Sequence, residues 1–464
     1  MSTITTDICV IGGGSGGLSV AAGAVQMGAR VVLIEGHKMG GDCLNYGCVP
    51  SKALLAQARA VKARGTKPTP NDFTAAMAHV KATIAAIAPH DSVERFEGLG
   101  VQVLQGHARF TGPDRAEVNG TTVKARRFVI ATGSAPFVPP IEGIDSVPYM
   151  TNETIFDQQA RPGHLLVIGG GPIGLEMALA HRRLGSEVTV IEGAKAMGRD
   201  DPDAAAIVLA SLRTEGIDIV EGATVEKLSG RAGALEVQVK GGTIFTGTHL
   251  LIAVGRKPNT DTLGLDRAGV KHDRNGVTVG PDLRSSNKRI YAIGDVAGKG
   301  QFTHLAGYHA GVIIRAMLFG LPAKARTDHI PHVTYTDPEL AHVGLSEADA
   351  RKQFGANLSV HKVGYDQIDR AQAEGATTGF LKLMVAHGRP VGCTIVGRQA
   401  GELIAPYALA IANKMKLSAI ANTVLPYPTL AEIGKRGAGA YFSGKLFDNP
   451  NVKRVVRLVQ KWLP

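Results

Sequence analysis

The chain has few cysteines, few aromatic residues and no long apolar run. Its 464 residues include only 4 cysteines and 1 tryptophan, and aromatic residues make up 5%. So few cysteines argue against a secreted scaffold held by disulfides. No stretch approaches the roughly 18 to 20 apolar residues that cross a bilayer. The first apolar run follows Met1 too closely to leave room for a removable signal. We therefore expect a cytoplasmic protein with no membrane contact.

The charge is basic but dispersed. The formal net charge is +11, yet no dense Lys/Arg run with interleaved aromatic residues is present. Nucleic acid is therefore not an expected partner, whereas anionic cofactors or acidic carrier proteins are compatible with this charge. The abundance of glycine, 58 residues, suits an α/β protein with many tight strand-to-helix turns, and the length suggests two to four domains.

One nucleotide-binding pattern occurs twice. The stretch "DICVIGGGSGGLSVAAGAVQMGARVVLIEG" begins at Asp7, and "HLLVIGGGPIGLEMALAHRRLGSEVTVIEG" begins at His164. Each predicts a buried strand, a Gly-x-Gly-x-x-Gly turn, a helix and a second strand that ends in Glu. The positions that match at a constant offset are Gly12, Gly14, Gly17, Gly28, Glu35 and Gly36 in the first copy, and Gly169, Gly171, Gly174, Gly185, Glu192 and Gly193 in the second.

This pattern is typical of dinucleotide binding. The glycines permit a tight turn, close approach of the backbone to a pyrophosphate and close helix–strand packing, while the terminal Glu can bind a ribose diol. A glycine-rich turn can also be purely structural, but the whole unit recurs. Two sites imply two dinucleotides, for which a flavin and a hydride donor are the natural pair. Glu192 would repel a 2′-phosphate and favours NAD, although Lys195 and Arg199 could accommodate NADP.

Two cysteines lie close together in "GGDCLNYGCVPSK". Zinc sites usually have shorter spacing, and no second Cys or His pair is near. A redox disulfide fits better if the backbone is distorted, because side chains five apart on a regular helix point about 140° from each other. Gly41 and Gly47 allow such a turn, and Pro50 disfavours helical geometry at Val49.

Other residues bear on the same site. Lys52 places a cation near the cysteine pair, where it can stabilise a thiolate or an anionic flavin. Cys9 and Cys393 lie in apolar runs and are expected to be inert core residues. In "KRIYAIGDVAG", a predicted strand stops at Asp295, which could hold a ribityl hydroxyl or simply form a strand-end turn.

The segment "GGDCLNYGCVPSKALL" resembles the redox-disulfide signature of the flavoprotein disulfide reductases, which include dihydrolipoamide dehydrogenase, glutathione reductase and mercuric reductase. The resemblance covers almost the whole chain, through "ATGSAPFVPP", "GGGPIGLE", "AVGRKPNT", "IYAIGDVA" and "YTDPELAHVGLSE". It implies an α/β fold with two Rossmann-like domains, for FAD and NAD(P), and a C-terminal α+β dimerisation domain. The expected division is 1–150 (FAD), 151–275 (NAD(P)), 276–328 (return to the FAD domain) and 329–464 (dimerisation).

The resemblance also implies a homodimer in which NAD(P)H reduces the flavin and electrons pass to the disulfide formed by Cys43 and Cys48. Cys48 would make the charge-transfer contact with the flavin, and Cys43 would exchange with substrate. Lys52 and Glu176 match an ion pair beside the flavin and nicotinamide. The FAD contacts implied are Gly12, Gly14, Gly17, Glu35, Gly41, Lys52, Thr132, Gly133, Asp295 and Thr303; the NAD contacts are Gly169, Gly171, Gly174, Glu192 and Gly255.

The sequence departs from the family near its C-terminus. The usual His-Pro-Thr-x-x-Glu segment, whose His is a general acid/base supplied by the partner subunit, here reads "LPYPTLAEIGKR", with Tyr427 and Glu432. Tyrosine titrates near pH 10, against about 6.5 for histidine, so it is a poor proton relay. Tyr427 could donate a hydrogen bond, assist thiolates that bind a metal, or only pack. His304 and His309 are candidate replacements for the imidazole.

Three functions remain open. The leading one is an enzyme that couples NAD(H) through FAD to a small dithiol or disulfide, as dihydrolipoamide dehydrogenase does, with the substrate carried on an acidic protein domain as one option. The second is reduction of a metal ion or thiol-bound metal, as in mercuric reductase, since the tyrosine at position 427 is a point of resemblance to that enzyme. However, the ending "VVRLVQKWLP" lacks the cysteine pair that captures mercury. The third is a flavin-binding partner protein with little turnover. No resident metal is expected.

The tail "NPNVKRVVRLVQKWLP" has the spacing of an amphipathic helix. Its apolar residues are Val452, Val455, Val456, Val459 and Leu463, and its basic residues are Lys453, Arg454, Arg457 and Lys461. Such a helix can lie on an anionic membrane or pack on protein. We expect it to pack on the subunit's own C-terminal domain with the basic face exposed, where it could guide an acidic carrier domain.

Overall fold

A computed structural model describes residues 2–463. The chain forms two compact units. The first comprises Met1–Ala194 and Ile217–Thr327, and the second comprises Lys195–Gly216 and Asp328–Pro464. The finer division into four segments at residues 150, 275 and 328 stays a prediction. Among the described residues, no helix is both long and apolar enough to cross a membrane.

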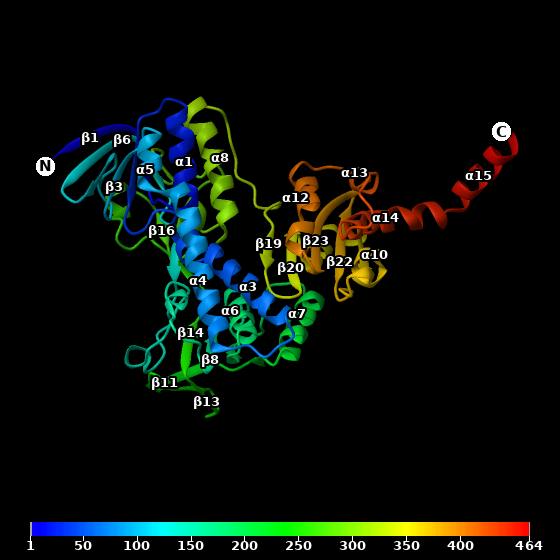
Figure 1. Ribbon diagram of the computed structural model, residues 1–464. Helices are drawn as coiled ribbons and strands as arrows, with labels where there is room; N and C mark the ends of the chain where they lie inside the picture. Colours follow the sequence, from blue (N-terminus) through cyan, green and yellow to red (C-terminus); the bar gives the residue numbers. More distant parts are fainter. Residues whose placement is uncertain (1, 464) are drawn as a thin grey trace. The chain divides into compact units, whose positions relative to one another are not determined.

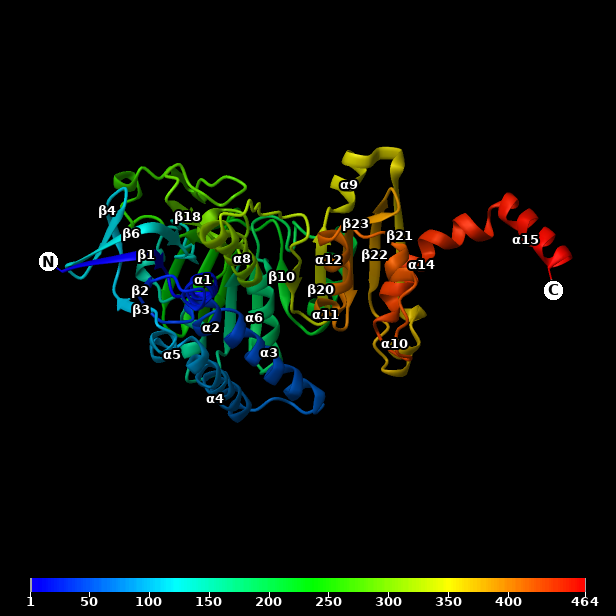
Figure 2. The same cartoon turned by 90° about the horizontal axis from the view of Figure 1, so that it is seen from above.

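The first nucleotide-binding repeat forms a largely parallel sheet of seven strands (Figure 1). Along the sheet the strands are β3 (Gln102–Gln105), β2 (Val31–Glu35), β1 (Thr3–Ile11), β6 (Thr121–Ile130), β5 (Arg115–Val118) and β4 (Arg109–Gly112), with β18 (Ile290–Ala292) also on β6. Helix α1 (Ser15–Gln26) follows β1 and packs beside α8 (Thr303–Phe319), as both views show (Figures 1 and 2). Cys9 is fully buried in β1, which confirms it as a core residue.

The second repeat forms a parallel sheet of four strands. Its strands in order are β10 (Asp218–Val220), β9 (Glu187–Ile191), β8 (His164–Ile168) and β14 (His249–Ile252), and α6 (Pro172–Arg183) follows β8. The register repeats with the sequence: Ile8 pairs with Val31 in the first sheet, and Leu165 pairs with Val188 in the second. Leu165 and Val188 occupy the same positions in the second repeat as Ile8 and Val31 do in the first. The two repeats therefore match in strand pairing as well as in sequence. This confirms the α/β fold.

Shorter elements complete the first unit. An antiparallel sheet contains β11 (Val225–Arg231), β12 (Ala234–Val239) and β13 (Ile244–Gly247), and two ribbons pair β7 (Ser134–Pro136) with β15 (Arg256–Pro258) and β16 (His272–Asp273) with β17 (Gly276–Val277). The helices are α2 (Gly41–Asn45), α3 (Cys48–Ala63), α4 (Pro70–Ile87) and α5 (Val93–Gly98). Helix α3 packs on both α4 and α6, so the segment with the cysteines reaches both nucleotide-binding repeats.

The second unit is built on an antiparallel sheet of five strands. Their order is β19 (His332–Thr334), β20 (Glu339–Gly344), β23 (Arg389–Gly397), β22 (Phe380–Ala386) and β21 (Leu358–Gly364). The helices are α7 (Pro202–Thr214), α9 (Glu347–Phe354), α10 (Asp369–Ala373), α11 (Ala400–Leu403), α12 (Ala405–Ala412), α13 (Ser418–Ala421), α14 (Glu432–Phe447) and α15 (Pro450–Trp462). Cys393 is fully buried in β23, as expected of a core residue.

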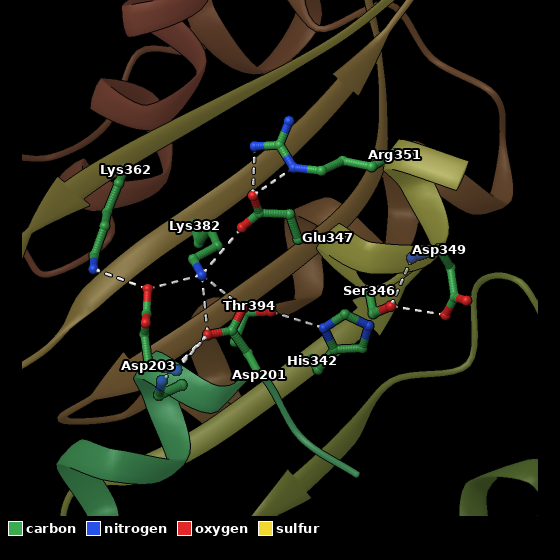
Figure 3. Close-up of polar contacts among 11 residues, drawn as sticks. Asp201, Asp203, His342, Ser346, Glu347, Asp349, Arg351, Lys362, Lys382 and Thr394 are labelled. Carbon is green, nitrogen blue, oxygen red and sulfur yellow. Dashed lines mark hydrogen bonds and ion pairs between the residues drawn. The ribbon is translucent and has the colours of Figure 1, made fainter. Parts of the chain in front are cut away.

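A buried lysine ties α7 to this sheet. Lys382 on β22 is 7% exposed, and its Nζ lies 2.8 Å from Asp201 and 3.0 Å from Asp203 at the start of α7 (Figure 3). Glu347 on α9 lies 3.2 Å from the same nitrogen. Burial opposes the charge on Lys382, but hydrogen bonds to these carboxylates hold its pKa above the usual value. The cluster explains why α7, which follows the second repeat in sequence, belongs to the second unit.

Helix α15 does not pack as expected. None of its residues is buried, and Val455 and Val459 on its apolar face are 59% and 41% exposed. The expectation that this face packs on the subunit's own C-terminal domain was therefore wrong. The preceding helix ends at Phe447, and Asn449 with Pro450 begins a new helix that leads away from the sheet (Figure 1). The exposure of the basic face is confirmed; residue 464 of the tail lies outside the described residues.

Removal of this tail should hardly affect folding. Because α15 buries no side chain, a chain ending at Asp448 should lose about 0.5 kcal/mol or less of unfolding free energy, the usual range for surface changes. Urea unfolding of the full-length and shortened proteins measures the difference. A loss of several kcal/mol would mean that α15 packs on protein in solution.

Candidate active site

The cysteine pair lies at a break between two helices. Helix α2 ends at Asn45, and α3 begins at Cys48, so the two cysteines belong to different helices. Gly47 lies between them with φ −118° and ψ −112°, outside helical geometry, which confirms the expected distorted turn. The expectation for Val49 was wrong, because it lies inside α3. Pro50 is tolerated there because N–H groups in the first turn of a helix have no acceptor within the helix, so the N–H that proline lacks is not missed.

The two thiols differ in acidity. The Cys43 thiol donates a hydrogen bond to the Cys48 sulfur, and Thr303 Oγ1 lies 3.5 Å from the same sulfur. These hydrogen bonds and the nearby Lys52 charge outweigh partial burial and lower the pKa of Cys48 to about 6. The same bond to Cys48, together with burial, raises the pKa of Cys43 well above the usual value. The reduced site therefore holds one thiolate, on Cys48, and one thiol, on Cys43.

An ion pair lies beside the thiols. Lys52, one turn along α3 from Cys48, places its Nζ 2.7 Å from Glu176 Oε2 on α6. The Glu176 side chain is only 5% exposed. A carboxylate so buried depends on its counterion, because an unpaired buried charge is costly. The pair implied by the resemblance is thus formed, and its role beside flavin and nicotinamide stays a prediction.

The two glycine-rich turns have the same geometry. Gly12 and Gly169 have φ of +111° and +115°, a region that favours glycine. A Cβ on Gly17 would lie 1.8 Å from the Gly12 carbonyl oxygen, and a Cβ on Gly174 would lie 2.1 Å from that of Gly169. Only glycine therefore lets each helix pack so closely on its turn.

The acid at the end of each second strand braces the turn. Glu35 accepts hydrogen bonds from the Gly13 N–H, at 2.5 Å, and from the His37 N–H. Glu192 accepts the equivalent bonds from the Gly170 N–H, at 2.7 Å, and from Ala194. Both carboxylates are thereby fixed next to the turn, with lone pairs left for a ribose diol.

The backbone near these turns leaves room for a ligand. A Cβ on Gly171 or Gly255 would meet nothing within 4 Å, and one on Gly14 would meet its nearest atom only at 3.8 Å, in Gly41. Gly41 has φ +60°, and a Cβ there would lie 2.7 Å from Gly14 Cα, so glycine is required at that close approach. Open space next to the N-termini of α1 and α6 fits a pyrophosphate at each. The residues present thus fit two dinucleotides.

A chain of polar contacts connects Asp295 to the cysteine turn. Asp295 Oδ2 accepts a hydrogen bond from Ser134 Oγ at 2.6 Å, and Arg256 Nε donates to the same hydroxyl at 2.8 Å. Arg256 also lies 2.9 Å from Asp42, which immediately precedes Cys43. Burial raises the pKa of Asp295, and the Ser134 hydrogen bond opposes that rise. Sequence reasoning missed Arg256, Ser134 and Asp42; the available signal was that they lie in the family segments "AVGRKPNT", "ATGSAPFVPP" and "GGDCLNYGCVPSKALL", respectively.

Arg256→Gln should destabilise the protein more than the neighbouring change Lys257→Gln. Arg256 is 10% exposed, and its loss would leave the partly buried Asp42 without its cation, at a cost of about 1 to 2 kcal/mol. Lys257 is 53% exposed, and its pair with Asp261 should contribute less than about 1 kcal/mol. Urea unfolding of both variants makes the comparison. Equal losses would show that the Arg256 contacts do not brace the turn.

Three other predicted flavin contacts have protein partners. Thr132 Oγ1 donates to the Asn259 carbonyl at 2.8 Å, and Asn259 Nδ2 donates back to the Thr132 carbonyl at 2.9 Å. The Asn259 N–H also bonds the carbonyl of Gly133, which has φ +66°. Thr303 places its hydroxyl on the Cys48 sulfur. Thr132 and Gly133 thus fix the loop, and Thr303 acts on the thiolate; their flavin contacts stay predictions.

Tyr427 and Glu432 do not form a dyad. The Tyr427 ring is 70% exposed, and its hydroxyl donates to Asp369 Oδ2 at 2.9 Å. This bond raises the pKa of Tyr427 above the usual value, which makes it a still weaker acid. Glu432 Oε2 is buried without a hydrogen-bond partner among the residues that the structure describes. The carboxylate that orients the family's histidine is therefore present but not engaged by the tyrosine.

The two candidate histidines lie in different environments. His309 is fully buried in α8, and its Nδ1 accepts a hydrogen bond from the Gly294 N–H. Burial lowers the pKa of His309 to about 4, so it stays neutral and structural near pH 7. As a buried, neutral residue bonded to the backbone, His309 is a poor candidate for proton exchange with substrate. His304 is exposed, with its ring stacked on Phe302 at 5.3 Å between centroids.

Two family profiles cover most of the chain. The profile described as "Pyridine nucleotide-disulphide oxidoreductase" matches residues 6–310, and its "dimerisation domain" matches residues 330–437. The chain belongs to this family. It is thus a flavoprotein disulfide reductase of a family that uses FAD and NAD(P)H, with a redox-active disulfide and a dimerisation domain that implies a homodimer.

Named relatives of this oxidoreductase differ in activity. A mercuric reductase from Lysinibacillus sphaericus is 33% identical over 92% of this chain and 81% of its own length. A dihydrolipoyl dehydrogenase from Thermus scotoductus is 36% identical over 92% and 95%. Among solved structures, the Cu(II) complex of the HOCl-induced flavoprotein disulfide reductase RclA from Escherichia coli has a TM-score of 0.86 at 27% identity, covering 94% of this chain and 99% of that one.

Proposed function

We propose that this oxidoreductase passes electrons between NAD(H) and a small dithiol or disulfide, as a dihydrolipoyl dehydrogenase does, through FAD and the Cys43–Cys48 pair. The observation that carries the proposal is the placement of the two cysteines on either side of the helix break, with Thr303 Oγ1 3.5 Å from the Cys48 sulfur and Lys52 one turn further along α3. In this proposal the Cys48 thiolate lies next to the flavin, and the Cys43 thiol exchanges with substrate; the opposite pKa shifts of the two thiols are consistent with these roles.

The chain's own residues have distinct tasks in this scheme. When bound, FAD would supply hydride acceptance from the nicotinamide and transfer of an electron pair to a disulfide. Glu35 and Asp295 would hold its ribose and ribityl hydroxyls, and Glu192 would hold the nicotinamide dinucleotide. Lys52, fixed by Glu176, provides positive charge beside the Cys48 thiolate.

Exchange with substrate takes place on sulfur. The Cys43 thiol loses its proton, attacks one sulfur of the substrate disulfide and displaces the other as a thiolate, which takes up a proton. The Cys48 thiolate then attacks Cys43, restores the enzyme disulfide and releases the second substrate thiol. The raised pKa of Cys43 makes its deprotonation the demanding step at neutral pH, and the chain has Tyr427 where the family has a histidine base.

NAD is the proposed nicotinamide cofactor, because Glu192 is fixed at the turn by two backbone N–H groups. Glu192→Gln should raise the preference for NADPH over NADH about tenfold, since it removes the charge that repels the 2′-phosphate. Steady-state kcat/KM for both donors gives the ratio, with Glu187→Gln, an exposed acid at the other end of the same strand, as control. A wild-type enzyme that already prefers NADPH tenfold would overturn the assignment.

Reduction of a metal ion is the second candidate. It is favoured by Tyr427 in place of histidine and by the similarity to proteins named mercuric reductase. Of the four cysteines, only Cys43 and Cys48 are accessible to such a substrate, because Cys9 and Cys393 are buried in strands. A third candidate, a flavin-binding partner protein with little turnover, would retain the same fold.

A panel of oxidants separates these functions. NADH oxidation by the purified dimer is measured with lipoamide, small disulfides or Hg(II), and each rate is compared with that of Cys43→Ala. The proposal expects lipoamide or another disulfide to give the largest Cys43-dependent rate. The largest rate with Hg(II) would favour the metal reductase, and no Cys43-dependent rate with any oxidant would favour the partner protein.

A further inference from the structure

Helix α15 presents an apolar face that the rest of the subunit leaves uncovered. Trp462 is 76% exposed and Leu458 58%, and none of the helix's residues, all of them described, is buried. Both views show α15 extending beyond α14, away from the five-stranded sheet (Figures 1 and 2). A contiguous exposed apolar surface of this kind indicates a binding site.

The two faces of α15 are cleanly separated. At 3.6 residues per turn, the apolar side chains cover an arc of about 160°, and the basic ones occupy an arc of about 100° opposite it. The apolar set is Val452, Val455, Val456, Leu458, Val459 and Trp462, and the basic set is Lys453, Arg454, Arg457 and Lys461. No acidic residue lies between Asn449 and Leu463.

This helix also lies outside the part of the chain that matches the family's dimerisation domain. The dimerisation profile ends at residue 437, whereas α15 begins at Pro450.

We propose that α15 docks on the surface of a membrane rich in anionic phospholipids. Lying in the plane of the interface, it would bury the apolar arc at the boundary of the acyl chains, while the long basic side chains reach the phosphate headgroups. Each Lys or Arg near such a surface raises affinity roughly fivefold. The net charge of +11 on the whole chain adds attraction of the same sign.

A second copy of the chain fits this surface less well. The helix is only about 20 Å long, whereas stable protein interfaces bury at least about 1,200 Å². Paired helices are usually matched by opposite charges beside the apolar seam, and α15 has only basic ones. Pairing two copies would bring these cations together without a counter-charge.

The single tryptophan allows a direct test with the intact FAD-containing protein. Trp462 is the only tryptophan in the chain, so its emission reports on this helix alone. Vesicles of phosphatidylcholine, with or without about a third phosphatidylglycerol, are titrated into the protein. We expect the emission to shift to the blue, and the protein to co-sediment, only with the anionic vesicles, at least tenfold more weakly in high salt.

Three double variants separate the contributions. Arg454→Gln with Arg457→Gln should weaken vesicle binding at least tenfold, whereas Lys81→Gln with Lys352→Gln, which removes the same charge from exposed positions elsewhere, should weaken it less than threefold. Val455→Asp with Val459→Asp should abolish binding. Equal binding to neutral and anionic vesicles, or none to either, overturns the proposal. If deletion of residues 449–464 instead lowers the oligomeric state in light scattering, a second copy is the occupant.

Discussion

Replacement of Cys48 by Ser is expected to remove the long-wavelength absorption band that the two-electron-reduced enzyme should show, while FAD remains bound. The band requires a thiolate next to oxidised flavin, and Cys48 is the thiol whose pKa is lowered, to about 6. The flavin contacts that we expect come from other residues, the Gly12–Gly17 turn, Glu35 and Asp295. Turnover with disulfides should fall roughly 10³-fold or more, the scale of losing a covalent catalytic group. A band that survives in Cys48→Ser would contradict the assignment.

The pH dependence of this band follows from the same pKa. Because the folded-state pKa of Cys48 is lowered, the thiolate and the band should be present above about pH 6 and disappear as the pH falls through that value. Cys43→Ala serves as the matched variant. It removes the hydrogen bond that contributes most to the lowered pKa, so the band should persist but with its midpoint at higher pH. Absorbance titration of both proteins measures the two midpoints.

Tyr427→His is expected to raise disulfide turnover near neutral pH by 10²- to 10⁴-fold, the usual contribution of general acid–base catalysis. An imidazole at this position would find Glu432, whose Oε2 is buried without a partner among the described residues, as an acceptor that orients it. In the family the histidine serves the partner subunit's disulfide, so the homodimer is the relevant species. The new rate should follow a titration near the usual histidine pKa of about 6.5.

Tyr427→Phe is the control for this change. It removes the hydrogen bond to Asp369 without adding an imidazole, so its turnover should remain close to wild type. If Tyr427→His is no faster than wild type, proton transfer is handled elsewhere. If Tyr427→Phe is much slower than wild type, the tyrosine has a catalytic role of its own.

The sequence predicts most of the fold, because the information lies in local spacing. The positive φ at Gly12 and Gly169 and the contacts that exclude a Cβ at Gly17 and Gly174 leave glycine as the only residue that fits. A duplicated spacing therefore predicts a duplicated geometry. The distorted turn between the cysteines is predictable for the same reason, although Val49 is helical because the first turn of a helix accepts a proline two residues into it.

Contacts between distant segments could not be predicted. Arg256 meets Asp42 across more than two hundred residues of sequence, and no spacing pattern indicates that pair. The attachment of α7 to the second unit likewise depends on Lys382, a residue that reads as part of an ordinary strand. Helix α15 shows the opposite problem: its periodicity predicts the helix correctly, but an apolar stripe does not indicate what it packs on.

The most direct test of the proposed electron path is an anaerobic titration of the purified enzyme with NADH, monitored by flavin absorbance and by thiol titration of the unfolded protein. The account predicts that each subunit takes up one electron pair with the appearance of two new thiols before the flavin bleaches, and a second pair as it bleaches. In Cys43→Ala the first uptake should be missing. If the flavin of the wild-type enzyme bleaches with the first electron pair and no thiols appear, the Cys43–Cys48 pair is not the electron carrier.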